Sequence, residues 1–322
     1  MYNLCARAQA SILPARSLMA PNSVLRSASD IGKTIWERLP SALRERPLFR
    51  AAGSWIHKRA LTMSGRSQSE STWFLRNEPL LVTIRDLVAD NFASGEVLRL
   101  CVVGCSTGAE IYSVLWAIRK AQPDVKILPI GIDISESAIA RATAGVYSPC
   151  DSELTGGFLH SQTVPVLSED SIRELFDKSG ELLRIKSWIA EGIRWEVGDA
   201  RDPEIAEKLG LQDMVIANNF LVHMKQREAT ACLGNVIRLV RPNGFFVCRG
   251  VDLDIRERAV DRLNLRPIPI RIEQIHDADP DLDARRHWPW KYYGLEPLDK
   301  TRKNWVQRYA CVFQAPTRPS TL

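Results

Sequence analysis

The chain has 322 residues, of which 45% are hydrophobic and 25% are charged, with a formal net charge of +5 at pH 7. This composition is ordinary for a globular protein, and the length allows one large domain with a smaller one. An apolar run of transmembrane length, a Cys-x-x-Cys pair and a nucleic-acid-binding motif are all missing, so we expect a cytoplasmic protein with reduced cysteines, no metal site, no nucleic-acid partner and no stable membrane insertion.

The first 60 residues are rich in Lys and Arg, and a helical pattern begins only at about residue 30. Residues 1–29 show little periodicity and are expected to form a disordered leader. Residues 30–66 carry apolar side chains at helical spacing, interrupted at Pro40 and Pro47, and are expected to form a helical N-terminal segment. Residues 1–60 hold ten Lys/Arg and three Asp/Glu. This charge suits docking of an acidic protein partner, although a solvated helical face explains it equally well.

Helices and strands alternate through the rest of the chain, which we expect to form one domain over residues 67–316. Helices are predicted over residues 79–91, 109–121, 135–144 and 226–240. Strands are predicted over residues 97–103, 126–132, 193–197, 214–217, 245–248 and 308–313. This alternation predicts an α/β fold with a doubly wound, mostly parallel, Rossmann-like sheet.

The turn between the first strand and its helix has the composition of a nucleotide site. An apolar run ends at Gly104, and small residues including Ser106 lead to Gly108, where a helix begins. A strand followed by a glycine turn and a helix N-terminus is how α/β proteins build such sites. The spacing fits neither a dinucleotide motif nor a phosphate loop. With Glu110 nearby, it suits a ligand bearing an amino group, such as the methionine end of S-adenosylmethionine, although an ordinary strand–helix turn has the same pattern.

Polar residues follow three further strands. Asp133 closes the second strand, 25 residues after Gly108, near the spacing at which nucleotide sites place a carboxylate on ribose hydroxyls. Asp199 and the pair Asn218–Asn219 follow two later strands. The carboxyl ends of parallel strands meet at one edge of the sheet, so these residues predict a shared crevice for a nucleotide-type ligand. Asp133 as a helix cap is the alternative.

Several segments resemble one enzyme family. Residues 104–113, GCSTGAEIYS, resemble the G-C-S-T-G-E-E-P-Y-S motif of CheR-type chemotaxis receptor methyltransferases. Further matches are TWFLR at 72–76 to T-x-F-F-R, GIDI at 131–134 to A-T-D-I, A-x-x-x-R-A-x-x-G-V-Y at 138–147 to L-x-x-A-R-x-G-x-Y, DMVIANN at 213–219 to F-D-x-I-x-C-R-N, and PNGF at 242–245 to P-G-G-Y. The resemblance implies a class I methyltransferase fold that binds S-adenosylmethionine and methylates glutamate side chains of chemoreceptors.

The resemblance also implies positions for the cofactor. Thr72 and Arg76 would cover its methionine part beside Glu110, Asp133 would hold the ribose, and Asp199 and Asn219 would lie near the adenine and the middle of the cofactor. Without the resemblance, the favoured interpretations are Thr72 as a helix cap, Arg76 as a surface ion pair and Asn219 as a turn residue. The complete set of predicted cofactor-binding residues is Thr72, Arg76, Gly104, Ser106, Gly108, Glu110, Asp133, Asp199, Asn218 and Asn219.

Departures from the family pattern concern the methyl acceptor. The family has Arg-Asn where this chain has Asn218–Asn219, and Tyr where it has His223. A carboxylate acceptor is ionised near neutral pH and needs a positive group such as Arg76 to hold it. A hydroxyl or amine acceptor needs a base, for which His223 is suited, although His223 could simply pack beside the cofactor.

Three functions follow, with Arg76 and His223 as the predicted catalytic residues. The first is transfer of a methyl group to a carboxylate oxygen of a protein glutamate. The second is methylation of a small-molecule oxygen or nitrogen with His223 as base. The third is a non-catalytic module that binds S-adenosylmethionine.

An aromatic cluster near the C-terminus allows two interpretations. Residues 287–294 and 304–310 concentrate Trp and Tyr next to Arg and Lys. Such side chains give a large contact area with little loss of entropy and can wall a substrate pocket. Packing over the edge of the sheet is the interpretation we favour.

Overall fold

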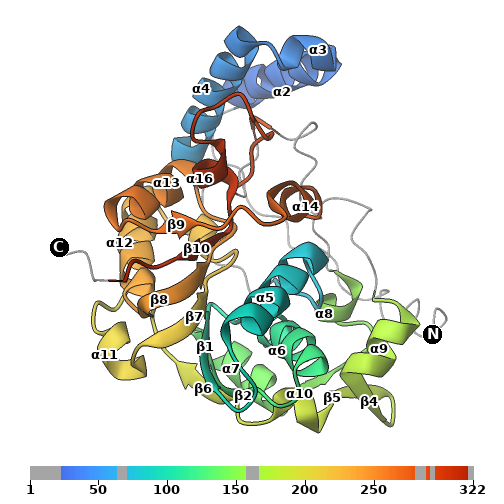
Figure 1. Cartoon of the computed structure of the whole chain (residues 1–322). Coiled ribbons are helices and arrows are strands. Elements are labelled where there is room, and N and C mark those ends of the chain that lie inside the picture. The colour runs from blue at the N-terminus through green and yellow to red at the C-terminus, as the bar shows by residue number, and fades with distance from the viewer. Residues whose placement is uncertain (1–22, 64–70, 157–166, 280–287, 291–293, 318–322) are drawn as a thin grey trace.

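A seven-stranded sheet forms the centre of the computed structural model, which describes residues 23–63, 71–156, 167–279, 288–290 and 294–317 (Figure 1). The strand order is β6-β2-β1-β7-β8-β10-β9, and only β10 pairs antiparallel with its neighbours. The bounds are β1 Val97–Val103, β2 Lys126–Asp133, β6 Arg194–Val197, β7 Gln212–Ile216, β8 Val240–Val247, β9 Arg266–Pro267 and β10 Val312–Gln314. The predicted doubly wound, mostly parallel sheet is confirmed.

Both faces of the sheet are covered by helices, because its central strands are apolar on both sides. In β1, Leu100 and Val102 belong to one buried cluster while Cys101 and Val103 belong to the other. The first cluster includes side chains of α5 (Glu78–Asn91), α6 (Ala109–Ala121) and α7 (Glu136–Ala144), and the second those of α11 (Ile205–Leu209), α12 (Gln226–Ile237) and α13 (Leu253–Arg262). None of the helices described is both long and apolar enough to cross a bilayer.

A second, three-stranded sheet occupies the region that lacked a clear sequence pattern. It has the antiparallel order β3-β5-β4 and is flanked by short helices, with bounds β3 Val146–Tyr147, α8 Ser152–Thr155, α9 Glu169–Leu175, β4 Phe176–Ser179, β5 Leu182–Ile185 and α10 Ser187–Ala190. The ring of Phe74 contacts Tyr147 and Phe176 edge to face, with centroid distances of 5.1 and 4.9 Å. The small sheet therefore supports the segment that carries Thr72 and Arg76.

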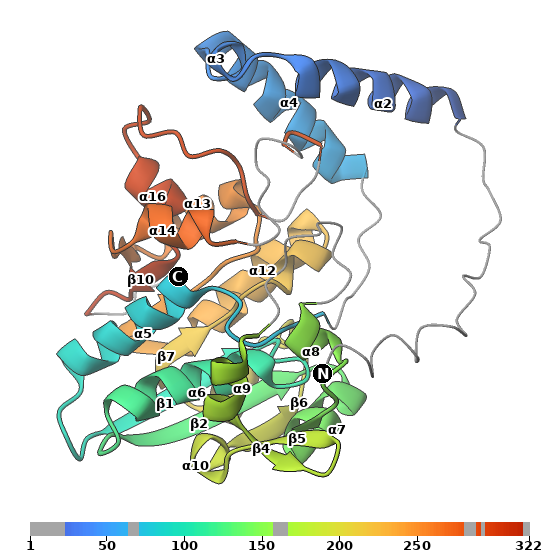
Figure 2. The ribbon, with the colours of Figure 1, turned by 90° about the vertical axis from the view of Figure 1, so that its right-hand side faces the viewer.

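The N-terminal helices stand away from the main sheet (Figures 1 and 2). They are α2 Ser23–Arg38, α3 Ser41–Arg44 and α4 Pro47–Met63, so the predicted breaks at Pro40 and Pro47 are confirmed. Helix α2 begins inside the segment expected to be a disordered leader, of which residues 1–22 lie outside the described residues.

The described part of the aromatic cluster packs in two places: Trp288 and Trp290 pack against the N-terminal helices, whereas Trp305 and Tyr309 pack with the buried cluster on one face of the main sheet. The ring of Trp36 meets Trp288 edge to face at 5.2 Å, and Nδ1 of His57 lies 2.9 Å from the carbonyl oxygen of Pro289. Arg50 pairs with Asp299 at 3.1 Å. Distant parts of the chain are therefore joined by one aromatic and ionic contact region.

The last predicted strand begins later than expected. Residues Trp305–Tyr309 form helix α16, and β10 starts only at Val312. Arg308 is the reason, because its guanidinium is buried in ion pairs with Glu296, Asp254 and Glu257. The alternating pattern predicts an outward-facing arginine, but the Arg308 side chain is buried and paired with these carboxylates.

The cysteines are mostly buried single thiols. Cys101, Cys105, Cys232 and Cys248 are free and buried, and Cys311 is free and half-buried. Burial raises the pKa of the Cys101 thiol to about 12, so this side chain stays protonated.

Candidate functional site

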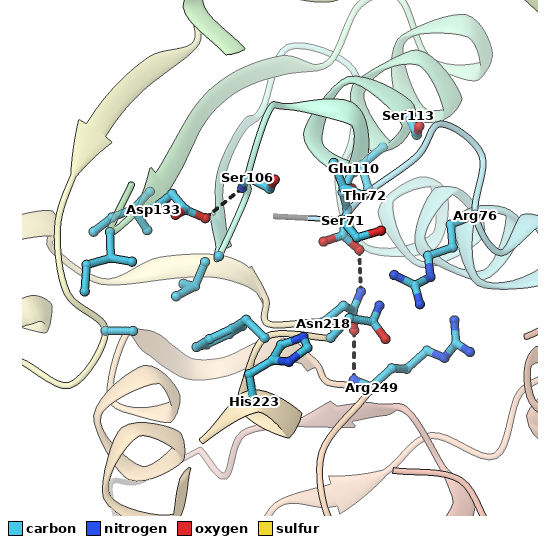
Figure 3. A pocket seen from close by; sticks show the side chains of 18 of the residues that line it. Ser71, Thr72, Arg76, Ser106, Glu110, Ser113, Asp133, Asn218, His223 and Arg249 are labelled. Carbon is cyan, nitrogen blue, oxygen red and sulfur yellow. Dashed lines mark hydrogen bonds between the residues drawn. The ribbon is translucent and has the colours of Figure 1, made fainter. Parts of the chain in front are cut away.

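A cavity of about 260 Å³ opens at the carboxyl ends of the parallel strands (Figure 3). Its walls come from the residues that follow β1, β2, β6, β7 and β8, and from a covering segment before α5. The lining includes Ser71, Thr72, Trp73, Arg76, Asn77, Gly104, Ser106, Glu110, Asp133, Asp199, Arg201, Asn218, Asn219, Phe220, His223 and Arg249. The structure thus brings the residues predicted at separate strand ends into one crevice.

The turn after β1 needs its glycines for two different reasons. Gly104 has φ +71, and a Cβ there would lie 2.7 Å from the ring of Phe220. Gly108 has φ +93 at the N-cap of α6, where a Cβ would lie 2.9 Å from the ring of Tyr112. Gly104 borders the cavity, whereas Gly108 does not line it and instead lets the chain turn into the helix.

Asp133 is held by the backbone beside this turn. Its Oδ2 accepts a hydrogen bond from the Ser106 N–H at 2.8 Å, and its Oδ1 accepts one from the Ser135 N–H at 2.9 Å. Ser135, not Asp133, caps α7, because the Ser135 hydroxyl accepts from the Ala138 N–H. Each carboxylate oxygen keeps acceptor capacity toward the cavity, as binding of ribose hydroxyls requires.

Asp199 has a nearby cationic partner. The Arg201 guanidinium contacts its carboxylate at 2.6 Å, and this hydrogen bond lowers the pKa of Asp199. Both side chains are partly exposed and line the cavity. The Asp199 carboxylate, which is expected near the adenine, therefore forms an ion pair with Arg201, a residue that sequence reasoning missed.

The opposite end of the cavity is built around Glu110. The Asn218 amide donates to Glu110 Oε1 at 2.6 Å, and Asn218 Oδ1 accepts from the Arg249 N–H at 2.8 Å. Burial raises the pKa of Glu110, while the Asn218 hydrogen bond and the charges of Arg76 and Arg249 oppose this rise. A buried carboxylate faced by cations suits a zwitterionic amino-acid group.

The segment before α5 covers this end. Arg76 stacks on the ring of Trp73, with 3.9 Å from its guanidinium carbon to the ring centroid. The Leu75 N–H donates to the Ser113 hydroxyl at 3.0 Å, which ties the segment to α6. Asn77 caps α5, so the interpretation of Thr72 as the cap of this helix is wrong, and Thr72 lines the cavity instead.

Asn219 and His223 follow β7. Asn219 has φ +61, and its N–H donates to the Arg249 carbonyl at 2.9 Å. His223 ends the short 3-10 helix η2 (Leu221–His223) and lines the same cavity as Arg76. Both predicted catalytic side chains therefore reach one cavity, and their roles stay predictions.

Sequence reasoning missed Trp73, Arg201 and Arg249. Trp73 lies inside the matched TWFLR segment, and Arg249 follows a predicted strand, so the strand-end argument applied once more would have identified it. Arg201 follows the predicted Asp199 by two residues and had no comparable signal.

Comparison with known families gives an extended match. The model described as "CheR methyltransferase, SAM binding domain" matches residues 70–252. This range contains every predicted cofactor-binding and catalytic residue.

Similar curated proteins match part of this chain and part of their own length. A probable biofilm formation methyltransferase WspC of Pseudomonas putida is 28% identical over 204 residues, which cover 62% of this chain and 44% of that protein. Chemotaxis protein methyltransferase 2 of Vibrio cholerae is 21% identical over 205 residues, which cover 61% of this chain and 65% of that protein. The chain therefore spans less than two thirds of the length of either relative.

Solved structures also align with this chain. Magnesium protoporphyrin IX methyltransferase of Synechocystis, solved with bound SAM, has 15% identity and a TM-score of 0.34 over 78% of this chain and 90% of that chain.

Proposed function

The chain belongs to the CheR methyltransferase family and carries its S-adenosylmethionine-binding domain over residues 70–252, and from this premise we propose that it transfers a methyl group to a carboxylate oxygen of a protein glutamate. The observation that carries the choice of acceptor is the cluster of Arg76 and Arg249 beside the hydrogen-bonded pair of Glu110 and Asn218. Cations at the transfer end of a site favour an anionic acceptor.

The residues fit the cofactor at both ends of the cavity. Asp133 presents carboxylate oxygens fixed by two backbone N–H groups, a suitable acceptor for a ribose diol. Glu110 presents a carboxylate for an ammonium group, and Arg76 a guanidinium for the carboxylate of the methionine part. S-adenosylmethionine supplies an activated methyl group on a sulfonium.

The side chains of the protein would act by positioning and by excluding water. The acceptor oxygen forms its bond to the methyl carbon as the carbon–sulfur bond breaks, so one negative and one positive charge disappear together and no proton moves. The positive charge of the cluster of Arg76 and Arg249 would attract and orient the acceptor carboxylate, and Trp73 and Phe220 would keep water from the cavity. No general base is needed for this acceptor.

The N-terminal helices are the proposed docking surface for an acidic protein substrate. Arg38, Arg46, Lys58 and Arg59 are exposed on α2, α4 and the turn between α3 and α4. Lys58 also pairs with Asp254 at 3.2 Å, which places this surface against the methyltransferase domain. An acidic helical substrate would meet these cations as it enters the site.

His223 at the cavity wall supports a second candidate function. A histidine there is suited to remove a proton from a hydroxyl or amine of a small-molecule acceptor. The two candidates differ in the stability of the product, because a methyl ester is cleaved by mild base while a methyl ether or methylamine is not.

The test compares two helical peptides that differ only at their acceptor side chains. One carries adjacent glutamates and the other carries glutamines, and each is incubated with the protein and methyl-labelled S-adenosylmethionine. We expect base-labile label, released as methanol, on the glutamate peptide alone. Base-stable label on a small-metabolite extract, with no methanol from the peptide, contradicts the carboxylate acceptor and supports the His223 alternative.

A further inference from the structure

Arg249 is built into the wall of the cavity by the backbone of two neighbouring strands. It follows β8, and its N–H donates to the Asn218 side chain at 2.8 Å while its carbonyl accepts from the Asn219 N–H at 2.9 Å. These bonds leave the side chain as the only part of Arg249 that can contact a ligand. The residue lies where the ends of β7 and β8 meet the cavity.

The side chain of Arg249 forms a buried ion pair. Its guanidinium contacts the carboxylate of Asp279, which follows α14 (Ile272–Asp277), and each of the two side chains is only 4% exposed. Removing two charges from water offsets most of the attraction between them, so a buried pair contributes little net stability. What the pair does provide is a guanidinium in one fixed orientation at the cavity wall.

Arg249 also supplies a charge that the neighbouring position lacks. The Asn218 amide and carbonyl are used by Glu110 and by the Arg249 backbone. A guanidinium at this end of the site therefore comes from the end of β8 instead of β7.

Figure 3 shows Arg76 and Arg249 extending on the same side of the Glu110–Asn218 pair, with Asp133 at the opposite end of the cavity. Both cations stabilise the charged form of Glu110. The bound cofactor brings one ammonium, matched by Glu110, and one carboxylate. Arg76 matches that carboxylate, and the Arg249 guanidinium, which contacts Asp279 through Nη2, has further N–H donors for another anion.

We infer that Arg249 is a substrate-binding residue that holds the acceptor carboxylate beside Arg76, and that Asp279 positions its guanidinium. This inference rests on the proposed glutamate acceptor and adds the residue that selects for it. Two other roles are distinguishable: Arg249 could bind the carboxylate of the cofactor, or its pair with Asp279 could only join α14 to the sheet.

The experiment measures binding of two probes to the protein saturated with S-adenosylhomocysteine. The probes are N-acetylglutamic acid α-amide, whose side chain holds its only carboxylate, and N-acetylglutaminamide, its neutral counterpart. We expect the wild type to prefer the acid about tenfold or more, and Arg249→Gln to abolish this preference, because hydrogen bonds to charged groups are lost. The affinity for S-adenosylhomocysteine should change less than about threefold.

A double variant separates binding from folding. Arg249→Gln alone removes the cation that contacts the buried Asp279, whereas Arg249→Gln with Asp279→Asn removes both charges and should restore stability. We expect the double variant to melt near the wild-type temperature and still show no preference for the acid. Arg85→Gln, a surface change outside the cavity, is the matched control and should leave both affinities unchanged.

Each of the other possible results contradicts a different part of the proposal. A preference for the acid retained by the double variant overturns the role of Arg249 and leaves the glutamate acceptor intact. Loss of affinity for S-adenosylhomocysteine as large as the loss for the acid assigns Arg249 to the cofactor instead. A wild-type protein without preference for the acid contradicts the proposed function itself.

Discussion

Replacing Asp133 by alanine tests whether the carboxylate at the end of β2 binds the cofactor ribose. The change removes the acceptor of the Ser106 and Ser135 N–H groups, which lie 2.8 and 2.9 Å from its oxygens. It also removes the two hydrogen bonds that we expect from the ribose hydroxyls. At about 1.5 kcal/mol for each bond to a charged group, the ligand loses ~3 kcal/mol, or roughly 100-fold in affinity.

Thermal denaturation with S-adenosylhomocysteine converts this loss into a measurable shift. At a ligand concentration of about 100 times the wild-type Kd, the wild type gains about 2.7 kcal/mol, and a variant weakened 100-fold gains only ~0.4 kcal/mol. For a large domain this corresponds to about 5 °C for the wild type and ~1 °C for Asp133→Ala.

The matched control is Asp124→Ala, an exposed carboxylate in the turn before β2 that does not line the cavity. It should keep the full wild-type shift. Asp133→Asn should resemble Asp133→Ala, because its amide nitrogen would face one of the two backbone N–H groups that the carboxylate now accepts from. A full ligand-induced shift in Asp133→Ala, at the same ligand concentration, refutes the ribose assignment.

Three further predictions concern other charged groups. Burial raises the pKa of Glu110, so its contribution to stability is present below its ordinary pKa of 4.5 and is lost as pH rises through the raised value. The affinity for S-adenosylhomocysteine should instead fall as pH drops through the raised value, because Glu110 then loses its charge. Urea titration should show the first trend and titration calorimetry the second, and Glu110→Gln should flatten both. His223→Gln should lower the rate of carboxylate methylation less than about tenfold, whereas a loss of about 100-fold or more would identify a general base. Arg308→Met should reduce the free energy of unfolding by about 3–5 kcal/mol in urea titrations, because Glu296 and its neighbours lose a buried cation, whereas Arg85→Met at the surface should cost at most about 1 kcal/mol.

The parts of the fold that follow from local patterns were predictable. The run at 97–103 is apolar at nearly every position, as a strand covered on both faces must be, and it forms β1. The strand-end rule needs only the direction of parallel strands, which is why Asp133, Asp199 and Asn218 could be assigned to one cavity before the structure was known.

The parts that depend on distant contacts were not predictable. The strands of the small sheet have only two to four residues, too few to show a period. Trp288 packs on Trp36, which lies near the other end of the sequence, and no local sequence pattern predicts this contact. Arg308 interrupts an apparent strand because its partners come from two other segments, Asp254 and Glu257 from α13 and Glu296 from the chain before α16.

The two ends of the cavity differ in the same way: one is built by neighbouring strands, and the other depends on segments far apart in the sequence. Asp133 and Ser106 are placed by β1 and β2, so the cofactor end is fixed by the sheet itself. The proposed acceptor end is lined by Arg76, which comes from the covering segment, and by Arg249, whose guanidinium contacts Asp279 beyond α14. Substitutions in these outer segments can change the acceptor while the strands keep their register. Cofactor binding should therefore survive changes at Asp279 that alter which acceptor is methylated, and this is why the resemblance in sequence identifies the cofactor more firmly than the substrate.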